Sequence, residues 1–188
     1  TTWIRRIDNG TIDVRSNLVL TNFLAPDSRT QGSALIQMSG TNNVILRGDG
    51  TNRYFNSIVI NKPGATVALT GSLGLQGAGM DLSVPAGTLD LSGYDVRVTD
   101  VMDVDGTLRV KGNESIVAGT FSLDTNTSTV VYHDSATTAW LTNFPTRTFG
   151  NLTFGGGKTH GFGTGPANQI TVCGVLDSDA LRDSRSIL

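Results

Sequence analysis

Apolar and polar residues alternate in short runs along much of the chain, and turn residues separate the runs. In five places a glycine and a small residue precede an apolar-x-apolar triplet, at residues 10–14, 71–75, 87–91, 106–110 and 119–123. Alternation of this kind places the two apolar side chains on one face of a strand and the polar side chain on the other. The pattern therefore predicts many short β-strands, each starting at a turn.

The spacing of these strands predicts how they are arranged. The first inward-facing residues of the successive central strands recur at about every seventh position from Ile58 to Phe121. Sandwiches and meanders show turn signals only about every 8–12 residues, so the shorter spacing favours a β-solenoid. We expect about three strands per coil, a coil of roughly 21 residues and, by preference, a right-handed path. The inward residues are Ile58, Val67, Leu73, Leu82, Leu89, Val96, Met102, Leu108, Ile116 and Phe121.

A longer period is superimposed on the short one. Residues 32–46 align with residues 119–132 about 87 positions later, and residues 55–60 align with residues 149–154, displaced by 94. The extra residues fall around 140–147, as expected of a loop that leaves the edge of a solenoid. We predict one solenoid domain over residues 1–176, made of two repeats at about 10–100 and 101–176. Residues 177–188 are then a C-terminal cap or tail, with a short helix as one option, and residues 3–7 a candidate cap at the other end.

Composition supports an all-β fold. The chain has 53 Thr, Ser and Asn residues and 23 Gly among 188, but one Glu and three Lys, so strong helix formers are scarce. Thr suits outer strand positions, and Asn or Asp at corners can adopt left-handed torsions or bond their own turn. A net charge of −2 disfavours general nucleic-acid binding, and the absence of an 18-residue apolar stretch disfavours membrane insertion. The single cysteine, Cys173, is expected to be a small core residue.

Several phrases resemble the β-solenoid repeats of very large secreted bacterial surface proteins. These are FNSIVI…TVALTGSLGL, GTLDLSGYDVRVTDVMDVDGTLRV, TSTVVYHDS and FGNLTF, and the resemblance covers about residues 10 to 176. It implies an extracellular setting in a stalk, an adhesin or an exported filament. The partners it implies are other segments of the same surface protein or filament, and a glycan or protein receptor is a further option.

Three aromatic residues lie in or beside the extra segment. An exposed platform of Tyr132, Trp140 and Phe144 could stack on sugars or dock a protein, and we take these residues as a candidate binding surface. The alternative is that the rings hold the extra segment against the coils or cap the end.

Three closely spaced carboxylates, Asp100, Asp103 and Asp105, are a candidate calcium site, because calcium prefers several oxygen ligands. Their spacing is not that of an EF-hand loop, and Met102 and Val104 are expected to point inward between them. A solvated outer row of carboxylates is the alternative. No other cofactor is expected.

Some right-handed β-helices cleave acidic polysaccharides, so an enzyme is a second interpretation. Such a site needs clustered carboxylates or a well-placed base. Residues that could supply one are Asp81, Asp90, Asp95, Arg97 and Arg109, and coiling could bring some of the carboxylates to one face. The two histidines, His133 and His160, are interpreted as surface or loop residues, and no residue is assigned a catalytic role.

The leading hypothesis is a non-enzymatic, extracellular structural or adhesive β-solenoid segment, part of a longer cell-surface, pilus or filament protein. The second hypothesis is a carbohydrate-active β-helix. The third is the receptor-binding tip domain of a pilus or phage fibre, acting through loops within residues 133–165.

Overall fold

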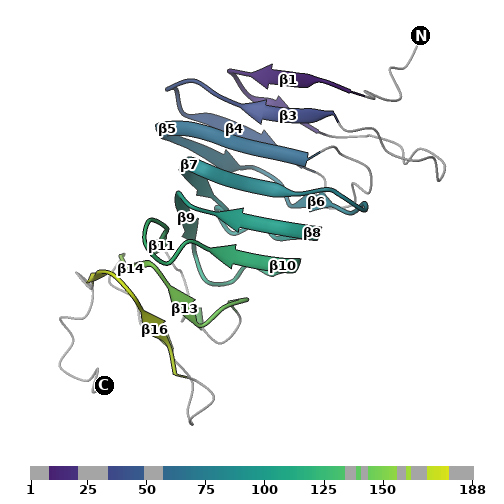
Figure 1. The fold of residues 1–188 in the computed structure, drawn as a ribbon. Helices are drawn as coiled ribbons and strands as arrows, with labels where there is room; N and C mark the ends of the chain where they lie inside the picture. The colour runs from purple at the N-terminus through teal and green to yellow at the C-terminus, as the bar shows by residue number, and fades with distance from the viewer. Residues whose placement is uncertain are drawn as a thin grey trace.

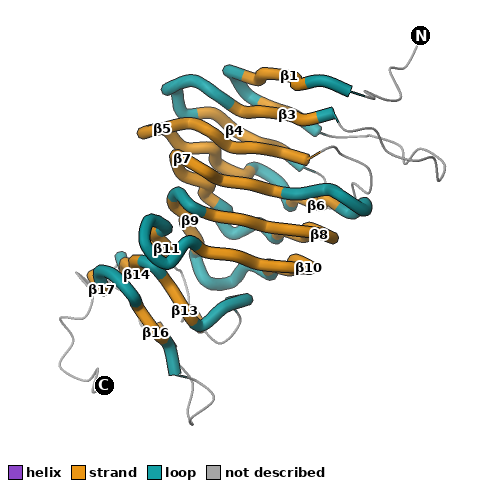
Figure 2. Tube along the Cα trace, viewed as in Figure 1, coloured by secondary structure: helices purple, strands orange, loops and turns teal. Residues whose placement is uncertain are grey.

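The computed structural model describes residues 9–20, 34–48, 57–133, 139–140, 144–155, 160–161 and 169–177. The described residues contain β-strands and no helix, so the all-β prediction is confirmed (Figures 1 and 2). Residues 3–7 lie outside this description, and so does the predicted C-terminal segment 177–188 except for Asp177, together with the predicted tail helix.

The strands follow one another around a coil, and every pairing between strands is parallel (Figure 1). Their bounds are β1 Thr11–Val14, β2 Leu18–Val19, β3 Leu35–Met38, β4 Val44–Arg47, β5 Ser57–Leu69, β6 Leu73–Leu75, β7 Leu82–Asp90, β8 Val96–Val104, β9 Thr107–Val110, β10 Ile116–Leu123, β11 Thr129–Tyr132, β12 Ala139–Trp140, β13 Thr148–Phe149, β14 Asn151–Phe154, β15 His160–Gly161, β16 Thr171–Val172 and β17 Leu176–Asp177.

The central coils have three faces, which we call A, B and C. Face A stacks β1, β3 and the first parts of β5 and β7 on the second parts of β8 and β10. Face B stacks β2, β4, the second parts of β5 and β7, and then β9, β11, β14 and β17. Face C stacks β6 on the first parts of β8 and β10. The longer strands belong to two faces because they continue around a corner.

Face B gives the length of a coil. Its inward ladder runs from Val44 to Leu176 in six steps, an average of roughly 22 residues per coil, which confirms the predicted solenoid. Single steps differ, since the step from Thr88 to Thr107 is five positions shorter than that from Thr11 to Leu35, and the corners take up this variation. The ladder consists of Val44, Val67, Leu89, Leu108, Val130, Leu152 and Leu176.

The ten predicted inward residues fall on the three faces in strict rotation. Each residue of that series pairs in register with the one three places later in the series. Most of the ten residues are almost fully buried. The ladders are Ile58–Leu82–Met102–Phe121 on face A, Val67–Leu89–Leu108 on face B and Leu73–Val96–Ile116 on face C. The spacing of about seven positions therefore corresponds to one face of the coil.

The longer repeat does not follow the faces in the same way. Residues 57–60 form the face A part of β5, whereas residues 151–154 form β14 on face B. The step from Val130 to Leu152 has the average length of a coil, although it includes residues 140–147. The coil that contains these residues therefore has no more residues than an average coil.

The corners are built from glycine. Positive φ angles occur at Gly10, Gly40, Gly64, Gly79, Gly87, Gly93 and Gly112, and Ser92 is the one other residue with a positive φ among those described. Among the described residues no corner Asn or Asp adopts a left-handed torsion, so that part of the expectation is wrong, but Asp90 and Asp124 bond their own turns, as expected, by accepting Ser92 N and Asn126 N. Gly87 also has no room for a side chain, because a Cβ atom there would clash with the Lys62 carbonyl oxygen.

Cys173 corrects another expectation, since its side chain is exposed. It follows β16, in which Val172 packs against the core while Thr171 faces outward. Alternation along this segment therefore turns Cys173 to the outside, where its backbone N–H bonds the Phe149 carbonyl oxygen at 2.9 Å.

Candidate functional site

Many outward-facing polar side chains bind the backbone of the neighbouring coil. The Oδ1 atoms of Asn17, Asn43 and Asn151 accept hydrogen bonds from Ile45 N, Thr66 N and Val175 N at 2.8 to 2.9 Å. Each bond joins residues 23 to 28 positions apart, and so connects consecutive coils. These asparagines stabilise the stack by joining consecutive coils.

The single glutamate performs the same task at a corner. Glu114 is 8% exposed, and its carboxylate accepts hydrogen bonds from Gly93 N at 3.0 Å and from Lys111 N and Gly112 N at 2.7 Å. Gly93 and Gly112 occupy corners of consecutive coils, and both have positive φ angles. Glu114 therefore accepts hydrogen bonds from three corner N–H groups that have no acceptor in a neighbouring strand.

A second buried charge lies near the other end of the stack. The Lys62 side chain is fully buried, and its Nζ donates a hydrogen bond to the Ser39 carbonyl oxygen one coil away. The Ser39 hydroxyl in turn donates to Asp13, and together with Arg15 it lowers the pKa of that carboxyl below its ordinary value. Three successive coils are thus connected through charged and polar side chains.

Three titratable side chains meet on face B. Asp90 Oδ2 lies 3.2 Å from Arg109 Nη1, and Asp90 Oδ1 lies 3.2 Å from His133 Nε2. Ser92 donates its backbone N–H and its hydroxyl to Asp90 Oδ1 at 2.8 and 3.0 Å. The Asp90 and His133 side chains are 10% and 12% exposed, whereas that of Arg109 is 36% exposed. The contacts span three coils, and Arg109 is the member most open to solvent.

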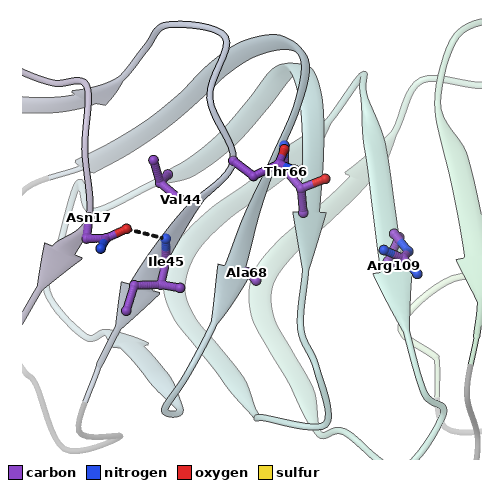
Figure 3. A pocket seen from close by; sticks show the side chains of 7 residues that line it. Asn17, Val44, Ile45, Thr66, Ala68 and Arg109 are labelled. Atoms are coloured by element: carbon purple, nitrogen blue, oxygen red, sulfur yellow. Dashed lines mark hydrogen bonds between the residues drawn. The ribbon is translucent and has the colours of Figure 1, made fainter.

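A shallow hollow of about 330 Å³ lies on the outside of face B beside this cluster (Figure 3). Ile45, Ala68, Asp90 and Arg109 are register partners on four successive strands, so the small Ala68 side chain leaves a depression between larger neighbours. The lining includes Asn17, Asn43, Ile45, Thr66, Ala68 and Arg109.

The predicted aromatic platform does not form as expected. Tyr132 is 1% exposed and Phe144 is 8% exposed, so both rings belong to the core and the prediction of a surface site is wrong for them. Their ring centroids are 6.4 Å apart, and Phe144 also packs against Phe121 at 5.5 Å and Phe149 at 5.4 Å. Apolar rings fill the interior of these later coils because the β11 and β14 positions point inward. Trp140 lies in β12, and its side chain is outside the described residues.

The surroundings of Tyr132 affect its hydroxyl. Burial raises the pKa of Tyr132 well above its ordinary value of 10.0, the Glu114 carboxylate raises it further, and Arg147 opposes the shift. The phenol is therefore held in its neutral form.

The candidate calcium residues do not converge. Asp100 accepts a hydrogen bond from Gly79 N at 3.1 Å, and Asp103 pairs in register with Ser83 and Ser122. Burial raises the pKa of Asp105, and the nearby Asp103 and Asp124 carboxylates add to the effect. Met102 and Val104 point inward, as predicted. Among the described residues no group of three or more His, Cys, Asp or Glu side chains is arranged to hold a metal ion.

The carboxylates considered for catalysis separate onto different faces. Asp81 precedes the face A part of β7, Asp90 lies on face B, and Asp95 precedes the face C part of β8. Asp81 Oδ1 and Asp95 Oδ1 accept backbone N–H groups of the next coil at 3.0 and 2.7 Å, a supporting role. The expectation that coiling brings them together is wrong.

The structure describes the side chain of only one of the two histidines. His133 is not a loose surface residue, because its ring is largely covered and contacts Asp90. His160 lies in β15, and its side chain is not described. Sequence reasoning missed the contact between His133 and Asp90 because the two residues are 43 positions apart and meet only once two coil steps are known.

Comparison of the chain with protein-family models, curated proteins and solved structures finds no match. Within the described part of the chain, no helix is long and apolar enough to cross a membrane.

Proposed function

We propose that this chain is a non-enzymatic, extracellular structural or adhesive segment of a longer cell-surface, pilus or filament protein. The observation that carries the proposal is the in-register ladder of face B, which continues through seven strands from β4 to β17. Parallel strands stacked in this way satisfy their backbone groups between coils and form a stiff element whose length grows by about 4.8 Å with each coil.

The use of polar side chains supports a structural role. In an enzyme, several buried polar groups would face a common cavity. Here the carboxylates and carboxamides of Asn17, Asn43, Asp81, Asp95 and Glu114 accept backbone N–H groups, most of them from the next coil. Their chemistry is thus directed to holding coils together.

Exposed apolar residues on the first and last described coils support the proposal that the partners are other segments of the same protein or filament. Ile12 is 37% exposed, although its register partner Ile36 is 9% exposed, and Leu176 is 44% exposed while Leu152 is fully buried. A further coil in the same register, from another segment of the same protein or filament, would cover either residue. Such stacking extends existing ladders and needs no new type of contact.

The test of location and role uses intact cells that produce the parent protein. Antibodies against face B of this segment should label the cells without permeabilisation, and external protease should remove the label. Labelling that requires permeabilised cells would refute the extracellular assignment. A panel of neutral and acidic polysaccharides should show no turnover by the purified protein.

A carbohydrate-active β-helix is the second candidate, and the Asp90–Arg109–His133 cluster is the observation that favours it. A carboxylate that orients an imidazole beside a guanidinium is suited to acid–base chemistry on an anionic sugar. Turnover of a polysaccharide that Asp90→Asn abolishes, while far-UV circular dichroism shows that the fold is retained, would support this candidate. Asp95→Asn is the control, since Asp95 bonds the backbone outside the cluster.

A further inference from the structure

We infer that the open edge of β10 binds an extended, basic segment of a partner protein, which adds to faces A and C as a further strand. The inference goes beyond the proposed function, because a structural segment and an enzyme could carry such an edge alike. It rests on the backbone groups, the apolar side chains and the charges along β10.

β10 is the last strand of faces A and C. It has eight residues and pairs with β8 alone, whereas face B continues through β11, β14 and β17. The later strands β12 and β13 pair with β15 and β16 and, in the part of the chain that the structure describes, not with β10. In Figure 1, β13 runs obliquely to β10. One side of β10 is therefore an unpaired strand edge, although the stack itself continues on face B.

The hydrogen bonds to β8 show which backbone groups of β10 face the open side. The Ser115 carbonyl oxygen accepts Val96 N at 2.9 Å, and Asp124 N donates to the Val104 carbonyl oxygen at 3.1 Å, so Ser115 and Asp124 face β8. Successive residues of a parallel strand face opposite neighbours, apart from the register shift within β10. Four residues therefore direct their N–H and C=O groups to the open side, where these groups have no partner among the described residues. They are Ile116, Ala118, Phe121 and Leu123.

The side chains of the same four residues point inward but are only partly buried. Their register partners on β8, in contrast, are at most 1% exposed, because β10 covers them. Phe144 packs against Phe121, with ring centroids 5.5 Å apart, and fills part of the interior at this level. We therefore expect an added strand to turn apolar side chains inward, with a small one opposite Phe121.

Carboxylates at one end of the edge specify the charge of the partner. Asp103 is the register partner of Ser122 on β10. Burial raises the pKa of Asp105, and the neighbouring Asp103 and Asp124 carboxylates raise it further. None of the three carboxylates forms an ion pair with a described side chain. Basic side chains on the outer face of an added strand, next to Ser122 and Asp124, would supply the missing positive charge.

The test measures binding of fluorescent peptides to the whole chain by anisotropy. The probe is the peptide VTVGTAKVK, which in register with residues 116–124 turns small or apolar side chains inward and places its lysines beside Ser122 and Asp124. We expect it to bind, and we expect the peptide with glutamate in place of both lysines to bind at least about tenfold more weakly. Equal binding of the two peptides, or no binding of the lysine peptide, would overturn the inference.

A third peptide separates strand addition from attraction between charges. It keeps both lysines but is N-methylated at its two threonines, and so lacks N–H groups that would face β10. Its binding should be weaker than that of the lysine peptide by about tenfold or more, since backbone hydrogen bonds supply much of the affinity in strand addition. Equal binding of the methylated peptide would refute pairing with the strand edge.

Two variants of the protein locate the site. Ala118→Pro removes one N–H group from the open edge and leaves the bonds to β8 in place, and Ser122→Lys puts a cation where the peptide lysines are expected. Both should weaken binding of the lysine peptide about tenfold or more, while far-UV circular dichroism shows that the fold is retained. Ser83→Lys is the matched control and should leave binding unchanged, because Ser83 also pairs in register with Asp103 but lies two coils from the edge. Binding that Ser122→Lys leaves unchanged would place the peptide elsewhere and refute the site, whatever the effect of Ala118→Pro.

Discussion

Replacing Glu114 by Gln tests how far the stack depends on side chains that serve its corners. The carboxylate is buried, and it accepts two hydrogen bonds at Oε1, from Gly93 N and Lys111 N, and one at Oε2, from Gly112 N. Gln keeps one oxygen but presents an NH₂ group to the third N–H. One bond is lost, a donor then faces a donor, and the remaining two bonds are no longer assisted by charge.

The expected cost follows from these contacts. A hydrogen bond to a charged group contributes roughly 1.5–3 kcal/mol, and a buried donor left without a partner costs about 1–3 kcal/mol. We therefore expect Glu114→Gln to lower the free energy of unfolding by about 3 kcal/mol. That is a large fraction of the roughly 5–15 kcal/mol typical of a folded domain. Glu114→Ala should cost more, because all three N–H groups lose their acceptor.

Urea denaturation followed by far-UV circular dichroism measures this change, provided that the slope of the transition is the same in all variants. Asp95→Asn is the control, since Asp95 is exposed and its side chain accepts one backbone N–H, that of Ser115. Its effect should stay within about 1 kcal/mol. If Glu114→Gln and Asp95→Asn cost the same small amount, water and not the Glu114 carboxylate satisfies the corner N–H groups, and the predicted dependence of the stack on Glu114 is refuted.

Three further predictions concern single contacts. A double-mutant cycle with Asp90→Asn and His133→Gln should give a coupling free energy of about 1 kcal/mol in urea denaturation, and additive effects would show that the 3.2 Å contact contributes nothing. Because burial raises the pKa of Tyr132, its neutral form stabilises the fold, and this stability should be lost as the pH rises above the ordinary tyrosine pKa of 10.0. Absorbance at 295 nm should therefore show ionisation of Tyr132 only together with unfolding, and its ionisation in the folded protein near pH 10 would contradict its burial. Gly87→Ala should destabilise by several kcal/mol, roughly the cost of a steric clash added to a strained φ angle, whereas Gly64→Ala, with a positive φ but open space, should cost about 1 kcal/mol. Thermal melting of both variants compares them, and equal costs would remove the steric argument.

The fold could be predicted because its information is local and repeats. Alternation fixes which side of a strand is apolar, and the spacing of Ile58, Val67, Leu73 and Leu82 fixes one turn of the coil before any contact is known. The same local patterns led to the wrong prediction that Tyr132 and Phe144 are exposed. An aromatic residue near a polar segment resembles an exposed one in sequence, and only the register with Val110 and Phe154 places Tyr132 inside.

The candidate site could not be predicted, for a related reason. Contacts between coils join residues about 20 or 43 positions apart, and each step varies by several positions because the corners differ in length. The pairing of Asp90 with Arg109 and the depression at Ala68 appear only when every step is counted correctly. A carboxylate such as Asp81 resembles a catalytic residue in sequence until its acceptor role toward the next coil is seen.

The variable corners also determine how such a molecule can change in evolution or in the laboratory. Since short and long steps alike return the chain to the same ladder, residues inserted at a corner alter the outline of one coil and leave its neighbours in place. A single residue removed from a face, in contrast, reverses the alternation in the rest of that strand, up to the next corner. The length of the stack can therefore change only by whole coils, in steps of about 4.8 Å.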